Sequence, residues 1–485
     1  MSTNLAGAWT ITGISVTNST ATLAPSRFPT LCDATHLHTT PQTTDPAAAG
    51  GLKVIDRWFD VPFDYTAPDR EKIRVFTRNA ISNKDNDNGE EGAKKPYCVY
   101  LQGGPGFECS APKSHPLTDF MLGKGYQMLY IDQRGTGLST PVSAMSLGKK
   151  GDVEEQARWL KGLRADNIVR DCEAIRQTLI GDQEKADRKK WSVVGQSFGG
   201  FCSVTYLSFY PEGLREVFTT GGMPPLVDNP DPVYERTYKS VVQRNAVYYK
   251  KYPQDVEGVK TILRFLDSKK ITLPAGGVLS AERFLSLGLS FGGHGGIDSV
   301  HQTIQRVLNE IELFGDISYK MLGHIEGVLG FDENPLYAVM HEPIYCQGQA
   351  SNWSAHRLKT DKFMWSSNDP QPTEPVYFTG EMVYPHVLDE YTELRQMKDV
   401  ANKIAESTDW PPLYDVDQLK KNDVPVYAAI YVDDMYVDYA FSTETAGTIR
   451  GAKTFITNSM HHNAIRAKSA EVLGKLWALK VEEVD

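Results

Sequence analysis

The stretch that decides the fold is Gly195-Gln196-Ser197-Phe198-Gly199, which follows the apolar run 191–194 and opens a helical stretch that continues through Tyr206. It matches the pattern G-x-S-x-G, which is found on a sharp turn between a buried strand and a helix. The glycines allow that turn, and the helix N-terminus behind the serine favours developing negative charge. A turn with an ordinary N-cap serine is the alternative, but this context favours a nucleophilic Ser197.

Apolar runs and helical patterns alternate on both sides of this stretch. One helix face is marked by Ile168, Cys172, Ile175 and Leu179, whose spacings of four, three and four residues place them on the same side. The predicted strands cover residues 58–63, 73–76, 97–101, 128–131, 191–194, 217–219, 424–432 and 454–456. Because strand, helix and strand follow each other in this order, we predict a mostly parallel, doubly wound α/β sheet.

The alternation stops between about residues 224 and 374. That segment carries helical patterns and glycine-rich loops such as 291–296, so we predict a mainly helical cap inserted into the α/β core. The residues before the core are rich in Thr, Ser, Ala and Pro, which is typical of an extended arm. The predicted divisions are an arm (1–50), the first part of the core (51–223), the cap (224–374) and the second part of the core (375–485).

Composition narrows the class of protein. Hydrophobic residues make up 41% and charged residues 23% of the 485 residues, values typical of a globular enzyme with one large domain and an insertion. The net charge of −10, without a long Lys/Arg stripe, argues against a nucleic-acid partner. Residues 1–9 lack the features of a secretory leader, and no run approaches the roughly 20 apolar residues of a membrane span. We therefore expect a cytoplasmic protein without a membrane partner.

The six cysteines are scattered and include no C-x-x-C pair, which argues against a zinc ribbon or a disulfide framework. No motif implies a metal or another cofactor. We expect free, buried thiols at Cys32, Cys98, Cys109, Cys172, Cys202 and Cys346.

A nucleophilic serine also needs hydrogen-bond donors for the oxyanion and a base. The backbone N–H of Phe198 is one candidate donor because it follows the nucleophile, and Gly104 in the loop 103–106 is the other. In this fold an acidic residue and then a histidine follow the serine, each after a later strand. Two positions qualify, and spacing leaves several candidates open at each. The candidates are Asp433, Asp434 and Asp438 for the acid, and His461 and His462 for the base.

Taken together, four motifs resemble the prolyl aminopeptidases, also called proline iminopeptidases, and most closely their larger form. The motifs are QGGPG at 102–106, DQRGTG at 132–137, DNIVRD at 166–171 and GQSFGG at 195–200. The resemblance covers residues 50–225 and 375–470 well, and the cap only in patches. It implies an α/β-hydrolase fold with a helical cap, and removal of an N-terminal residue, with proline expected, from peptides.

The resemblance also selects among the open candidates. The family's acidic residue ends a Gly-Arg-Tyr-Asp motif, which matches 431–434 and implies Asp434, with Asp433 second. The family histidine precedes two small or polar residues, as His462 precedes Asn and Ala, and His461 is second. Two residues depart from the family: Gln102 replaces a histidine and Phe198 replaces a tryptophan. Both changes leave the backbone donors in place but alter the pocket, and so bear on selectivity for proline.

An exopeptidase must also recognise a free α-amine, which carboxylates in a closed pocket can do by charge pairing. The family supplies such glutamates from its cap. Glu342 and Glu381 lie among aromatic and apolar neighbours and are the candidates here, with a salt bridge inside the cap as the alternative for each. Tyr345 and Trp353 are candidates to wall a proline ring, although at least one of them is expected to belong to the core.

The sequence therefore predicts a serine exopeptidase that acts on peptides with a free N-terminus through an acyl-enzyme. Ser197 is the expected nucleophile, His462 the base and Asp434 the residue that orients the imidazole. An esterase, an amidase or a biosynthetic hydrolase on the same framework is the alternative, since a fold does not determine its substrate. A binding protein that retained the scaffold without catalysis is the second alternative.

Overall fold

The computed structural model describes residues 35–42, 51–83, 89–367 and 374–482. They form a nine-stranded sheet in the order β1-β2-β3-β5-β4-β6-β7-β8-β9. The strands from β5 to β9 in this order pair in parallel, while β1, β2 and β3 pair antiparallel at one edge. The strands are β1 Thr35–Gln42, β2 Leu52–Pro62, β3 Lys72–Ser82, β4 Tyr97–Leu101, β5 Gln127–Ile131, β6 Trp191–Gln196, β7 Leu214–Thr220, β8 Val426–Tyr431 and β9 Ala452–Thr457.

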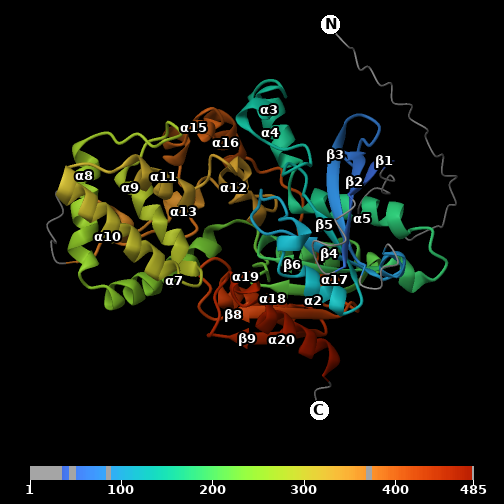
Figure 1. The fold of residues 1–485 in the computed structure, drawn as a ribbon. Coiled ribbons are helices and arrows are strands. Elements are labelled where there is room, and N and C mark those ends of the chain that lie inside the picture. Colours follow the sequence, from blue (N-terminus) through green and yellow to red (C-terminus); the bar gives the residue numbers. More distant parts are fainter. Residues whose placement is uncertain (1–34, 43–50, 84–88, 368–373, 483–485) are drawn as a thin grey trace, which may run out of the picture.

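The central strands form because they are short apolar runs that are covered on both faces. All residues of β5, β6 and β8 are buried, as expected for a parallel sheet between two layers of helices. Successive residues of these strands point to opposite faces, where they enter two separate hydrophobic clusters. The doubly wound α/β sheet predicted from the sequence is therefore confirmed (Figure 1).

The core helices lie on both faces of this sheet. Helices α5 and α6 pack on one face, and α2 and α20 pack on the other. The C-terminal segment forms two helices, α19 and α20, because Lys468 between them has a non-helical backbone (φ −138°, ψ 41°). The core helices are α1 Glu90–Ala93, α2 Thr118–Gly123, α3 Ala144–Gly148, α4 Val153–Lys161, α5 Ala165–Ile180, α6 Phe198–Phe209, α17 Val416–Leu419, α18 Tyr439–Thr448, α19 Ala464–Ala467 and α20 Ser469–Val481.

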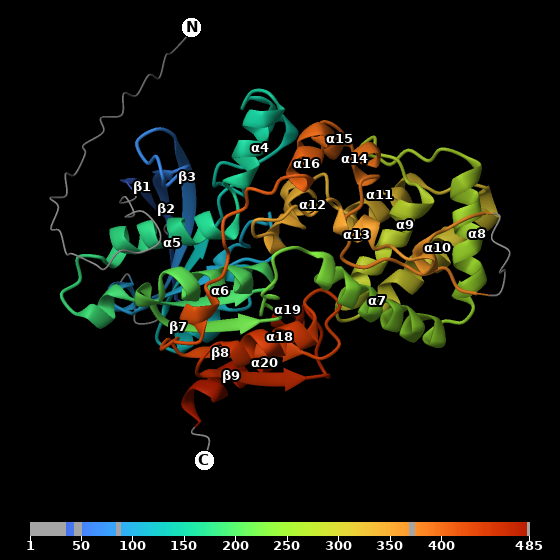
Figure 2. The same cartoon turned by 180° about the vertical axis from the view of Figure 1, so that it is seen from behind.

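A second group of helices lies to one side of the sheet. Figures 1 and 2 show α7 to α11 and α13 gathered there, with α12 and α16 between them and the core. These helices are α7 Asp231–Lys251, α8 Asp255–Ser268, α9 Ala281–Leu285, α10 Gly296–Phe314, α11 Tyr319–Val328, α12 Pro335–Met340, α13 Ser354–Arg357, α14 Val387–Glu390, α15 Thr392–Arg395 and α16 Lys398–Ala405. Helices α14 to α16 lie between residue 374, the predicted end of the cap, and β8. The cap boundary at residue 374 stays a prediction.

Two further expectations concern the whole chain. Within the part of the chain that the structure describes, no helix is long and apolar enough to cross a membrane. Five of the six cysteines are buried and free, namely Cys98, Cys109, Cys172, Cys202 and Cys346. Cys32 and most of the predicted arm lie outside the described residues, and the described residues of the arm form β1.

Candidate active site

Ser197 occupies the sharp turn between β6 and α6. Its backbone has φ 54° and ψ −124°, a conformation that costs a non-glycine residue on the order of 1–3 kcal/mol. The turn also requires Gly199, because a Cβ there would lie 1.9 Å from the backbone oxygen of Leu101 in β4. Ser197 is only half-buried, so its hydroxyl is presented at the carboxyl ends of the parallel strands, where ligands bind in open α/β sheets.

A row of hydrogen bonds joins Ser197 to the loops after β8 and β9. The Nε2 atom of His462 lies 2.9 Å from Ser197 Oγ, and Nδ1 lies 2.7 Å from Asp434 Oδ2. The other oxygen of Asp434 accepts the backbone N–H groups of Tyr436 at 2.9 Å and Val437 at 3.1 Å, which fixes the carboxylate. Asp434 and His462 are 3% and 7% exposed, so the row is shielded from water along most of its length.

The competing candidates lie elsewhere. Asp433 is exposed, and Asp438 accepts the backbone N–H groups of Ala440 and Phe441 at the start of α18. The ring of His461 packs against His294 of the cap, at a centroid distance of 5.0 Å. The structure thus brings Asp434 and His462, and neither Asp433 nor His461, to the serine.

The charges around His462 determine its protonation. Burial of the imidazole acts to lower the pKa of His462, but the Asp434 carboxylate opposes it and Glu381 adds to that effect, so the pKa lies above the ordinary value of 6.5. The Tyr436 ring meets the imidazole edge-on, at a centroid distance of 4.7 Å. The imidazole therefore lies between an acidic partner and an aromatic wall.

This raised pKa predicts the pH dependence of turnover. His462 must be neutral to accept the serine proton, so activity should rise as the pH passes through the histidine pKa, with a midpoint above 6.5. The measurement is kcat/KM between pH 5 and 9 on a substrate for which chemistry limits the rate. A profile that is flat from mildly acidic to neutral pH would contradict a histidine base.

The candidate oxyanion donors flank the nucleophile. Phe198 is the first residue of α6, where backbone N–H groups lack an intrahelical acceptor. The loop with Gly104 follows β4 and lies close to the serine, since a Cβ on Gly103 would be 3.0 Å from Ser197 Cβ. Gln102 holds this loop, because its side chain accepts the Tyr100 hydroxyl at 2.7 Å and donates to the Glu108 carbonyl at 3.2 Å. The glutamine that replaces the family histidine therefore has a structural role in the loop.

Glu342 follows α12 in the chain, and its buried carboxylate faces the start of α13. Its two carboxylate oxygens accept the backbone N–H groups of Ser354 at 3.1 Å and Ala355 at 2.9 Å. Burial raises the pKa of Glu342, while these hydrogen bonds oppose the shift. The carboxylate thus has backbone partners of its own, and a role in substrate binding stays a prediction.

Glu381, the second predicted glutamate, contacts Tyr337 of α12 and lies near His341. Its carboxylate accepts the Tyr337 hydroxyl at 2.6 Å, and its other oxygen lies 4.0 Å from His341 Nε2. The side chain is 16% exposed, and its charge acts on His462. Of the two predicted glutamates, Glu381 is therefore the one whose charge raises the pKa of His462.

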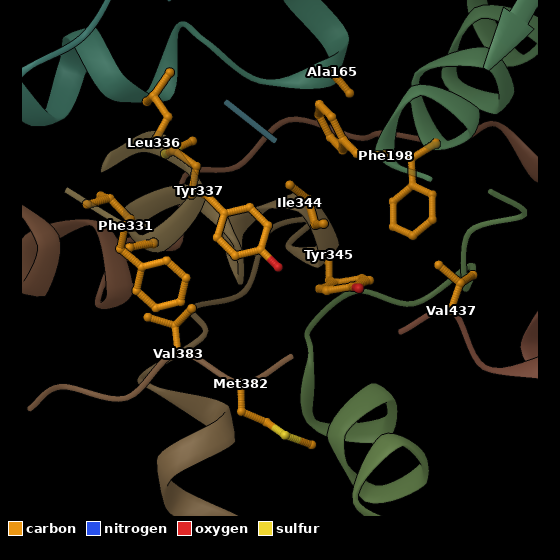
Figure 3. Close-up of a cluster of buried hydrophobic side chains, with 14 of the residues drawn as sticks. Ala165, Phe198, Phe331, Leu336, Tyr337, Ile344, Tyr345, Met382, Val383 and Val437 are labelled. Carbon is orange, nitrogen blue, oxygen red and sulfur yellow. The ribbon is translucent and has the colours of Figure 1, made fainter. Parts of the chain in front are cut away.

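Several aromatic side chains pack together in this region. Figure 3 shows Tyr337 and Tyr345 directed into one apolar cluster that also contains Phe198. Tyr345 is buried beside Phe201, at a ring distance of 5.8 Å, and its role as a wall for a proline ring stays a prediction. Trp353, the other predicted wall residue, instead donates its indole N–H to Asn402 of α16 at 3.0 Å. Its position is that of a residue that anchors α13 to α16.

Sequence reasoning missed two tyrosines in this region. Tyr234 of α7 is 1% exposed, and its hydroxyl has no hydrogen-bond partner among the described residues. Burial and the charges of Glu342 and Glu381 raise its pKa, which places it near both glutamates. Tyr337 binds Glu381 directly. Neither tyrosine belongs to a motif, so only the fold reveals them.

The described residues contain no group of three or more His, Cys, Asp or Glu side chains that could hold a metal ion.

The fold and the site together define a class of protein. A mostly parallel sheet carries a strained serine after a buried strand; the serine is hydrogen-bonded to a histidine, and the histidine to an aspartate. This arrangement is that of the serine hydrolases of the α/β-hydrolase class. A sequence model described as alpha/beta hydrolase fold matches residues 99–264.

The relatives place the chain more closely. It is 41% identical to proline iminopeptidase aneH of Aspergillus aculeatus, over 88% of this chain and 93% of that one. It is 35% identical to a proline iminopeptidase of Aeromonas sobria, over 88% of this chain and 97% of that one. The solved proline iminopeptidase of Mycobacterium smegmatis is 12% identical with a TM-score of 0.41, over 87% of this chain and 97% of that one. The protein belongs to the proline iminopeptidase family.

Proposed function

We propose that the protein is a serine exopeptidase that releases N-terminal proline from peptides through an acyl-enzyme. The observation that carries the proposal is the hydrogen-bonded row Ser197–His462–Asp434, with the charge of Glu381 acting on the same imidazole. Membership of the proline iminopeptidase family supports proline as the residue released.

In the first half-reaction, Ser197 Oγ attacks the carbonyl carbon of the N-terminal residue and passes its proton to His462 Nε2. The N–H groups of Phe198 and Gly104 stabilise the oxyanion. The C–N bond then breaks, and the departing amine takes the proton from His462. Asp434 stabilises the imidazolium throughout these steps.

In the second half-reaction, a water molecule gives a proton to His462 Nε2 and attacks the acyl carbon. The bond to Ser197 Oγ breaks, the serine recovers its proton and free proline leaves. Throughout, Glu342 and Glu381 bind the ammonium group of the substrate, and the cap excludes solvent and limits the length of chain before the scissile bond.

This proposal predicts a selective loss when a glutamate is neutralised. Glu381→Gln should cost on the order of 2–5 kcal/mol of transition-state binding for a prolyl arylamide, because a buried ammonium loses its ionic partner. A small neutral ester should lose much less. Glu342→Gln should act in the same direction, but it also places an amide NH2 against a backbone N–H of α13, so its thermal midpoint must be measured alongside.

The comparison uses kcat/KM for both substrates in each variant, with Glu333→Gln, an exposed glutamate just before α12, as the matched control. N-acetylprolyl arylamide, tested on the unmodified enzyme, should be a poor substrate since it lacks the charge and adds bulk. Equal losses on ester and arylamide would mean that the glutamates are structural. Efficient cleavage of the acetylated substrate would favour an esterase or amidase instead.

A further inference from the structure

Tyr337 joins the candidate ammonium site to the cap. It lies in α12 and is 7% exposed, and its hydroxyl donates to Glu381 Oε1 at 2.6 Å. Its ring is held on two sides, by Phe331 at 5.6 Å and by His341 at 5.1 Å between centroids. A buried ring held in this way allows the hydroxyl little freedom, so the oxygen it binds is fixed as well.

The same turn of α12 touches the loop that carries the candidate oxyanion donor. A Cβ on Gly106 would lie 2.8 Å from Leu336 Cβ and 2.9 Å from the backbone nitrogen of Tyr337, so only glycine allows the two backbones to approach so closely. The Tyr337 ring also meets Phe107 of that loop at 5.4 Å. One short helix therefore contacts both the oxyanion loop and the carboxylate of Glu381.

This double contact matters because, in an N-terminal α-amino acid, a single carbon atom separates the amine nitrogen from the carbonyl carbon. The group that binds the amine and the donors that bind the oxyanion must therefore be held at one separation. A glutamate has several rotatable bonds and does not maintain that separation unaided. The hydrogen bond from Tyr337 supplies the missing constraint.

We propose that Tyr337 is a positioning residue that sets the distance between Glu381 and the oxyanion loop, and that it thereby selects α-amino acyl substrates. The inference rests on the proposed function, since Glu381 must bind the substrate ammonium. Burial and the charge of Glu381 raise the pKa of Tyr337 well above its usual value, so the hydroxyl remains a donor throughout the working pH range.

The test is Tyr337→Phe, which keeps the ring and deletes the hydrogen bond. We expect kcat/KM for prolyl arylamide to fall at least tenfold, while the loss on a small neutral ester stays within about twofold. β-Homoprolyl arylamide carries one extra methylene between amine and carbonyl. The preference for prolyl over β-homoprolyl substrate should shrink at least fivefold, on the order expected when one charge-assisted hydrogen bond is lost. Unchanged preference, or equal losses on arylamide and ester, would overturn the proposal.

Two further variants make the test specific. Tyr391→Phe is the matched control, because Tyr391 is a buried tyrosine that packs on the same Phe331 ring at 5.2 Å and makes no hydrogen bond to Glu381. Tyr391→Phe should leave two ratios of kcat/KM unchanged: that of prolyl arylamide to ester, and that of prolyl to β-homoprolyl arylamide. In a cycle with Glu381→Gln, Tyr337→Phe should add little to the loss on the arylamide, whereas losses that multiply would show that Tyr337 acts independently of Glu381.

If Tyr337→Phe lowers the thermal midpoint too far to be assayed, Glu381→Asp replaces it. This change keeps the charge but withdraws the carboxylate by one methylene from the Tyr337 hydroxyl, so it should also shift preference toward the β-homoprolyl substrate. An unchanged preference in that variant would count against the proposal. Failure of the proposed function is recognised separately, because the unmodified enzyme would then fail to cleave prolyl arylamide or would accept its N-acetyl form equally well.

Discussion

Ser197→Ala should lower kcat for a prolyl arylamide by a factor on the order of 10⁶, because the nucleophile and the base act as one unit. The residual rate would come from the oxyanion donors and from substrate binding alone. The fold should be retained, since alanine has the same Cβ as serine and the Ser197 hydroxyl is hydrogen-bonded only to His462 Nε2 among the described residues. The measurement is kcat together with the thermal midpoint.

Ser208→Ala is the matched control for this variant. Ser208 lies in the same helix, α6, and its hydroxyl donates only to the Val204 carbonyl one turn earlier, so its removal should leave turnover unchanged. A fluorophosphonate probe should label the unmodified protein and the Ser208 variant but not the Ser197 variant. Turnover close to that of the unmodified enzyme in Ser197→Ala would remove the acyl-enzyme mechanism, and with it the exopeptidase proposal.

The adjacent histidines allow an equally large and sharper contrast. His462→Ala should reduce kcat by several orders of magnitude, on the order of 10⁴ to 10⁶, because no other described side chain accepts the serine proton. His461→Ala should lose less than about tenfold, since its ring packs against His294 and does not reach the serine.

Both histidine variants should be assayed on the prolyl arylamide and on the neutral ester. The base serves either substrate, so His462→Ala should damage both equally, in contrast to Glu381→Gln. If His461→Ala caused the larger loss of kcat, the base would be His461 and not His462. A selective loss on the arylamide alone would assign His462 to substrate binding rather than to proton transfer.

Local sequence patterns were enough to predict eight of the nine strands, all except β1, and the nucleophilic turn. Strands such as β4, β6 and β8 are continuous apolar runs, because parallel strands in the middle of a sheet are covered on both faces. The turn at Ser197 requires glycine where the backbones of β4 and α6 approach each other, and that requirement is visible in five consecutive letters. Patterns of this kind act over a few residues and can be read directly.

The choice between neighbouring residues was made by the tertiary structure. Asp433 and Asp434 are equivalent in spacing, but the backbone N–H groups of Tyr436 and Val437 hold only Asp434, whose second oxygen then faces His462. The resemblance to the family pointed to the same residue from a motif. The physical reason for that choice, a buried carboxylate in a tight loop, appears only once the loop is folded.

For the glutamates that are proposed to bind the substrate amine, the sequence and the tertiary structure again contributed different information. The sequence by itself marked Glu342 and Glu381 as acids in apolar surroundings, and that remains its contribution. Only the fold showed that Glu342 binds the start of α13, whereas Glu381 is held by Tyr337, 44 residues away in the chain. Hydrogen bonds between distant segments leave no periodic signal in the sequence, because they depend on where helices pack and not on what their neighbours in the chain are.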